Sequence, residues 1–133
     1  MAWKNYNRFS KYKNTKIEYD GILFDSKKEC RRWKELRTAE EAGAIGDLRR
    51  QVRFELIPAQ REPDTRGPKG GLIKGRLIER KVEYVADFVY VDLRTGQTVV
   101  EDVKGQKDGA AYSVFVIKRK LMLQKYGIQI TEV

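Results

Sequence analysis

Two stretches of the chain place apolar residues at the three- and four-residue spacing of an amphipathic helix. The first extends over about residues 26–42, with Ser26 suited to cap its start and Trp33 and Leu36 on its apolar stripe. The second extends over about residues 111–126 and ends at Gly127, a residue type that often closes a helix. These patterns predict two helices, one in each half of the chain.

Runs rich in valine, isoleucine and tyrosine predict strands, because β-branched and aromatic residues suit a pleated surface. The most apolar runs cover residues 82–91 and 99–105, and the turn signal at residues 92–96 predicts that they form an antiparallel hairpin. The order of helix, three strands, helix and strand predicts an α/β fold with a sheet covered by helices. The other predicted strands are a hairpin at residues 16–24, a strand at 49–59 and a last strand at 128–131.

The chain length of 133 residues suits one domain, which we expect over residues 17–133. Within it, residues 61–75 hold two prolines and four glycines, which predicts a mobile basic loop or a β-excursion able to close on a ligand. Residues 1–16 precede the domain as a basic arm with interleaved aromatic residues, in which Lys11 and Lys13 are candidate phosphate contacts. The alternative for this arm is a disordered tail whose aromatic residues pack on the domain.

Composition narrows the chemistry that the domain can perform. The net charge of +9 predicts a polyanionic partner, with nucleic acid as the first expectation. The absence of histidine excludes the reaction classes that need an imidazole, and a single cysteine, Cys30, excludes an intrachain disulfide and a multi-cysteine zinc site. No apolar stretch suits a membrane span or a signal peptide, so we expect a cytoplasmic protein.

Charged residues interrupt the two most apolar strands. A buried, unpaired carboxylate is costly, so Asp87 in the first run and Asp102 with Lys104 in the second need a compensating role. A hairpin folded about residues 94–95 brings Asp87 opposite Asp102, and strand alternation puts Asp102 and Lys104 on one face. Glu101 and Val103 then point to the other face, and Glu101 becomes the alternative acid if the strand is turned over, although its spacing to Lys104 is less suitable.

Two or three carboxylates and a lysine are the groups that metal-assisted phosphodiester hydrolysis needs. Carboxylates without histidine or thiolate favour Mg²⁺ or Mn²⁺ over zinc. Glu29, near the start of the first predicted helix, is a candidate third acid. Its alternative role is structural, because Ser26 and Glu29 have the spacing of a capping box.

These residues resemble the PD-(D/E)xK nuclease superfamily, with a restriction-endonuclease-like core of order α-β-β-β-α-β and a mixed sheet flanked by helices. The resemblance covers about residues 24–131, although Ala86 stands where the motif has proline. It implies that Asp87, Asp102, Glu29 and the main-chain carbonyl of Val103 bind the metal. It also implies that Lys104 is the catalytic lysine beside the catalytic acids.

The resemblance is closest to small phage-encoded proteins of the Holliday junction resolvase type, which implies a homodimer acting on branched DNA in the host cytoplasm. We therefore expect a metal-dependent, structure-specific DNA endonuclease. One alternative is a duplex-cleaving nuclease of the transposon-end or restriction type, and another is a nucleic-acid-binding protein without catalysis. Further candidate DNA contacts are Lys118, Arg119 and Lys107, with a surface lysine that covers the apolar helix face as the alternative for Lys118.

Overall fold

The computed structural model describes residues 15–133, which contain two helices and ten strands. The helices are α1 (Lys27–Glu41) and α2 (Gly109–Tyr126). The long strands are β3 (Ile45–Ile57), β8 (Val82–Asp92) and β9 (Gln97–Asp102). The short strands are β1 (Ile17–Tyr19), β2 (Ile22–Phe24), β4 (Gln60–Arg61), β5 (Thr65–Arg66), β6 (Leu72–Ile73), β7 (Leu77–Glu79) and β10 (Thr131–Glu132).

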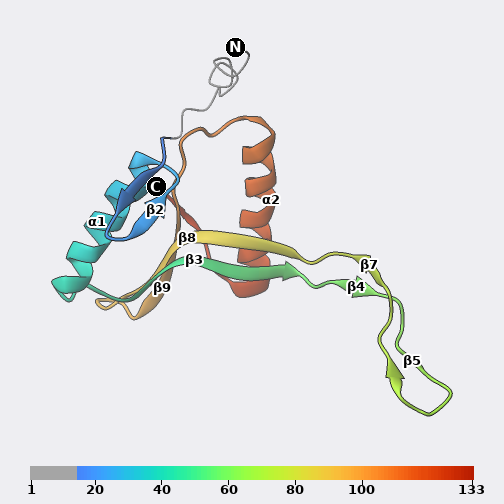
Figure 1. Cartoon of the computed structure of the whole chain (residues 1–133). Helices are drawn as coiled ribbons and strands as arrows, with labels where there is room; N and C mark the ends of the chain where they lie inside the picture. The colour runs from blue at the N-terminus through green and yellow to red at the C-terminus, as the bar shows by residue number, and fades with distance from the viewer. Residues whose placement is uncertain (1–14) are drawn as a thin grey trace.

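The central sheet has the strand order β10-β9-β8-β3. It is mixed, because β10 runs parallel to β9 whereas the β9–β8 and β8–β3 pairs are antiparallel. The helices α1 and α2 stand on either side of it (Figure 1). The predicted α/β class with a mixed sheet and flanking helices is therefore confirmed.

Each face of the sheet has its own hydrophobic core. Beneath α2, Phe115 and Met122 pack against Tyr84 and other apolar residues of the sheet. Beneath α1, Trp33 and Leu36 pack with Phe24, Phe88 and other apolar residues. The stripe predicted for the first helix is thus its buried face, and Cys30 belongs to the same core with 2% of its surface exposed.

Local hydrogen bonds fix the start of α1 and the end of α2. Ser26 caps α1, where its hydroxyl accepts a hydrogen bond of 3.1 Å from the Glu29 N–H. Gly127 closes α2 in the left-handed region at φ 67°, and its N–H donates to the Leu123 carbonyl at 3.0 Å.

Residues 58–81 form an excursion between β3 and β8, which we call the arm. Its chain runs out and back through two antiparallel pairs, β4 with β7 and β5 with β6. Figure 1 shows the arm projecting well away from the body of the protein. Of the two alternatives for residues 61–75, the structure therefore shows the β-excursion and not an unpaired loop.

Three expectations for the chain need correction or fall outside the structure. The strand predicted at residues 49–59 starts earlier, at Ile45, because an irregularity between Gly46 and Arg49 breaks the alternation there. The last strand is Thr131–Glu132 and not residues 128–131, because backbone pairing with β9 begins only at Thr131, opposite Glu101. The basic N-terminal segment predicted at residues 1–16, which is distinct from the arm at residues 58–81, lies almost wholly outside the described residues. In the described part, neither helix is long and apolar enough to cross a membrane.

Candidate functional site

Asp87 and Asp102 lie on the neighbouring strands β8 and β9. The last residue pair of their ladder is Phe88 with Glu101, so Asp87 comes opposite Asp102 one step further along the two strands. Asp87 is also fixed by the backbone beyond Asp102, because its Oδ2 accepts a hydrogen bond of 2.7 Å from the Val103 N–H. The hairpin thus brings both acids to one end of the β8–β9 ladder.

The Asp102 carboxylate is held by two side chains. Lys104 Nζ lies 2.8 Å from Oδ1, and the Tyr84 hydroxyl donates to Oδ2 at 2.7 Å. Lys104 Nζ also lies 3.5 Å from the centre of the Phe115 ring of α2, a cation–π contact that fixes the ammonium group. Asp102 and Lys104 consequently form an ordered pair on the α2 side of the sheet.

Glu29 reaches the site from the first turn of α1, where 5% of its surface is exposed. Its Oε1 lies 3.5 Å from the Gln51 amide nitrogen and 3.6 Å from an Arg50 guanidinium nitrogen. Within residues 15–133 no hydrogen bond joins the Ser26 N–H to this carboxylate, so the reciprocal half of the capping box is not made, although a backbone contact from Asp25 lowers the Glu29 pKa. Ser26 therefore caps the helix while the Glu29 side chain faces the site.

Gln51 connects two of the acids. Its amide nitrogen lies 3.5 Å from Glu29 Oε1 and 3.4 Å from Asp87 Oδ1, both at the long limit for a hydrogen bond. Its backbone has φ 51°, a left-handed conformation that residues other than glycine rarely adopt inside a strand. Such conformations cluster at functional sites, where the surrounding structure holds the strain.

Glu101 has a different environment from Asp102. It is 1% exposed, its two oxygens accept bonds of 2.8 and 2.7 Å from Arg32 of α1, and the Tyr90 hydroxyl donates to it as well. These partners satisfy the carboxylate on the α1 side of the sheet. Of the two candidate acids next to Val103, Asp102 is thus the one that lies with Lys104.

A cavity of about 350 Å³ lies between the start of α1 and the ends of the ladder. Its lining includes Glu29, Asp87 and Val103. Lys28 also lines it and donates a hydrogen bond of 2.6 Å to the Lys104 carbonyl, which ties α1 to the segment after β9. Glu29, Asp87 and the neighbouring Asp25 therefore border one cavity together with the segment that carries Lys104.

Burial makes the charged forms of Asp87 and Glu29 costly. It raises the pKa of Asp87 to about 7, against the opposing effect of the Val103 N–H and with further raising by Asp102 and Glu29. The pKa of Glu29 is raised by burial first and by nearby Asp25 second, while Arg50 lowers it. The cavity is thus an electrostatically unfavourable place for two ionised acids, and a cation would relieve that cost.

Replacing Asp87 by asparagine should stabilise the metal-free protein increasingly as the pH rises. Because the folded state keeps a proton that the unfolded chain releases above its usual pKa of 3.8, wild-type stability falls as the pH rises from about 4 through about 7. The Asp87→Asn variant has no such proton, so it should gain about 2 to 4 kcal/mol relative to wild type over that interval. Urea unfolding in EDTA at several pH values measures this, and a difference that stays constant with pH would contradict it.

The oxygen donors of the site suit a hard cation, although they are not yet gathered around one point. Over residues 15–133, no group of three or more acidic or cysteine side chains is arranged to hold a metal ion. The Gln51 amide lies between Glu29 and Asp87, and Lys104 engages Asp102, so each carboxylate already has a nitrogen neighbour. Carboxylate and carbonyl oxygens are the donor types that Mg²⁺ and Mn²⁺ prefer.

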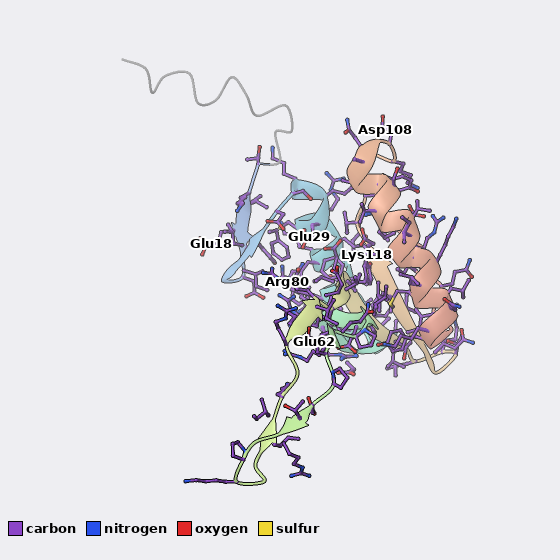
Figure 2. The ribbon with its side chains drawn as sticks, turned by 90° about the vertical axis from the view of Figure 1, so that its right-hand side faces the viewer. Glu18, Glu29, Glu62, Arg80, Asp108 and Lys118 are labelled. Carbon is purple, nitrogen blue, oxygen red and sulfur yellow. The ribbon has the colours of Figure 1, made fainter. Side chains whose placement is uncertain are left out.

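The predicted DNA contacts are not part of this cluster. Lys118 lies on α2 (Figure 2), where it makes no ion pair with the described acids. Arg119 is paired with Glu132 at 3.1 Å, which reduces its availability for a phosphate. Lys107 is exposed in the segment before α2, and Lys11 and Lys13 lie outside the described residues.

Three residues of the site, Arg50, Tyr84 and Gln51, received no role from the sequence. Arg50 neutralises Glu29 and stacks its guanidinium over the Phe24 ring at 4.7 Å. In the sequence, Tyr84 has the pattern of an aromatic core residue. Its one other signal is that a buried tyrosine hydroxyl needs a hydrogen-bond partner, and in the structure that partner is Asp102. Gln51 carried no signal of its backbone conformation, because glutamine has no preference for the left-handed region.

No curated protein and no solved structure matches this chain. A family model does match, over residues 9–131, which include all the acids of the site together with Gln51 and Lys104. The chain belongs to this family, DUF1064, which is described as a family of proteins of unknown function.

Proposed function

We propose that this protein is a metal-dependent DNA endonuclease of the PD-(D/E)xK type. The observation that carries the proposal is the single cavity bordered by Glu29, Asp87 and Val103, with the Asp102–Lys104 pair adjoining it. The succession of α1, β3, β8, β9, α2 and β10 supports a restriction-endonuclease-like core, since the arm is the only large excursion within it. The proposed ligands come from three parts of this core: Glu29 from α1, Asp87 from β8, and Asp102 with Val103 from the end of β9.

Glu29, Asp87, Asp102 and the Val103 carbonyl would hold Mg²⁺ or Mn²⁺. When bound, the ion would supply a polarised phosphoryl oxygen and a water of lowered pKa. Lys104 would stabilise the negative charge that develops on the phosphate, because its ammonium already lies beside Asp102 at 2.8 Å. Tyr84 and Val103 position the two aspartates through the hydrogen bonds described above, and Gln51 spaces Glu29 from Asp87.

DNA is the proposed substrate because the chain has a net charge of +9, and branched DNA is proposed from the family resemblance. A four-way junction needs two symmetric cuts, which fits a homodimer with two sites. Exposed apolar residues of α2 support self-association, since Val114, Ile117 and Leu123 are each more than half exposed around the half of the helix away from the core. Such an apolar surface suits a protein contact better than a phosphate contact.

One specific observation favours the rival function of a nucleic-acid-binding protein without catalysis. The 2.8 Å pair between Lys104 and Asp102 is also what a purely structural ion pair would look like. The two functions differ in metal dependence, because a simple binder responds to Mg²⁺ only through ionic strength. Duplex cleavage of the transposon-end or restriction type differs from junction resolution in the substrate that is cut.

The deciding experiment compares a labelled four-way junction with a linear duplex of the same sequence, in Mg²⁺ and in EDTA. We expect paired, symmetric cuts in the junction, no cleavage in EDTA, and little cutting of the duplex. Equal cutting of both substrates would indicate a duplex nuclease and not a junction resolvase. Tight binding of DNA with no metal-dependent cleavage of either substrate would favour the non-catalytic function.

A further inference from the structure

The arm carries an excess of positive charge that the protein itself does not neutralise. Arg76 pairs with Glu62 at 3.0 Å, and Lys81 pairs with Glu83 at the foot of the arm. Within residues 15–133, the other basic residues of the arm form no ion pair with a carboxylate. Those five residues are Arg61, Arg66, Lys69, Lys74 and Arg80.

A wide cavity of about 730 Å³ opens where the arm joins the body. Arg53, Arg61, Arg80 and Lys81 line it, and its one acid is Glu83. That acid is already engaged by Arg53 at 3.1 Å and by Lys81, which leaves Arg61 and Arg80 as uncompensated cations. Figure 2 shows Arg80 at the point where the arm leaves the body. A cavity with this lining is complementary to a phosphate backbone.

The arm is an organised ribbon. Its two sides meet at Gly75, where an added Cβ would lie 1.6 Å from the Glu62 carbonyl oxygen, so only glycine fits. The Gly75 N–H donates to Asp64 at 2.8 Å, and Arg61 donates to the Gly75 carbonyl at 3.2 Å. The Glu62 N–H donates to the Arg76 carbonyl at 2.8 Å. These cross-links order the backbone of a two-stranded ribbon and fix the Arg61 side chain, and such a ribbon is narrow enough for the major groove.

We propose that the arm and the cavity at its foot form a second DNA-binding element, which grips the duplex beside the catalytic cavity. The inference rests on the proposed function in taking DNA as the ligand. Strand β8 connects the two sites, because Asp87 lies seven residues beyond Arg80. At about 3.3 Å per strand residue the separation is roughly 23 Å, which is less than one turn of duplex DNA. One duplex can therefore contact both sites.

A second copy of this chain is the competing occupant, since Leu72, Ile73 and Ile78 of the arm are each more than half exposed. Charge favours DNA over a second copy. Two arms that met would bring their unpaired cations together, and like charges brought together across an interface cost several kcal/mol. The exposed apolar side chains are instead suited to contacts with sugars and base edges once phosphates hold the ribbon in a groove.

The test measures affinity for a labelled duplex by fluorescence anisotropy in EDTA, over a series of salt concentrations. The Arg61→Ala/Arg80→Ala double variant should bind about tenfold more weakly than wild type. The salt dependence should also weaken, so that the magnitude of the slope of log affinity against log salt falls by about 2. The control is Arg94→Ala, which removes a charge from the turn at the other end of β8. It should bind like wild type, and thermal unfolding establishes that all variants are folded.

Unchanged affinity and slope in the double variant would overturn the inference, as would a wild type that does not bind duplex. A loss of self-association in the double variant, seen by analytical ultracentrifugation with unchanged DNA affinity, would also overturn it and would assign the arm to a second copy. Binding is read in EDTA, so the outcome is independent of cleavage. A protein that binds through the arm but never cuts would refute the proposed nuclease and leave the arm as a DNA contact.

Discussion

The Lys104→Met variant is expected to cleave its DNA substrate about 100 to 1,000 times more slowly than wild type, while binding it with similar affinity. Removing one preorganised group that stabilises developing charge has an effect of about this size. Methionine keeps an unbranched side chain of similar length but has no ammonium group for Asp102, for the Phe115 ring or for the phosphate. Single-turnover cleavage at saturating protein isolates the chemical step, and anisotropy in EDTA measures binding separately.

The matched control is Lys120→Met, which makes the same chemical change at an exposed position of α2. It should cleave at the wild-type rate, because the residue lies outside the Asp102 cluster. A Lys104→Met rate within about twofold of wild type would show that the ammonium does not act in cleavage. A variant that has lost its fold would be recognised by its unfolding curve, so a structural role for Lys104 is distinguished from a chemical one.

The local parts of this fold were predictable because the determinants are close together in the sequence. The turn at residues 92–96 and the alternation on either side of it restrict the hairpin to few registers, since a slip by one residue would turn every side chain over. That restriction is why Asp87 and Asp102 were expected at one place, and why Asp102 was expected to share a face with Lys104. The Ser26 cap and the Trp33 stripe of α1 are local in the same sense.

The remaining features depend on contacts that no local pattern records. Gln51 meets Glu29 and Asp87 only because β3 pairs with β8 and also contacts α1, and its left-handed backbone opposes its own preference. The early start of β3 was hidden by the irregularity after Gly46. The pairing of Arg32 with Glu101 joins residues 69 positions apart, so the two charges could not be matched before the structure was known.

Removing the Glu101 carboxylate should destabilise the protein more than any change to an exposed charge. Arg32 donates two hydrogen bonds to the Glu101 carboxylate in a bidentate contact, and the Tyr90 hydroxyl donates a third. Breaking a buried pair by removing one partner typically costs about 3 to 5 kcal/mol, because the other charge stays buried and unpaired. Arg32 retains some exposure and can recover part of its hydration, so Glu101→Gln should cost about 3 kcal/mol, measured by urea unfolding.

The control for this prediction is Glu35→Gln. Glu35 contacts the same guanidinium at 2.8 Å, but its side chain is 54% exposed, so its loss should cost less than about 1 kcal/mol. The double variant Arg32→Met/Glu101→Met should recover much of the lost stability, since replacing a whole buried pair by apolar residues is often neutral. Equal costs for Glu101→Gln and Glu35→Gln would contradict the assignment of Glu101 as a buried structural acid.

The same variants separate Glu101 from Asp102 in function, although the two acids are adjacent in sequence. At a temperature where it is folded, Glu101→Gln should retain metal-dependent cleavage, because its carboxylate lies on the α1 side with Arg32 and Tyr90. Asp102→Asn should lose cleavage while it keeps the Tyr84 contact that helps to position it. If Glu101→Gln abolished cleavage in the folded state and Asp102→Asn did not, the acid partner of Lys104 would be Glu101, and the proposed ligand set would have to be rebuilt on the opposite face of the sheet.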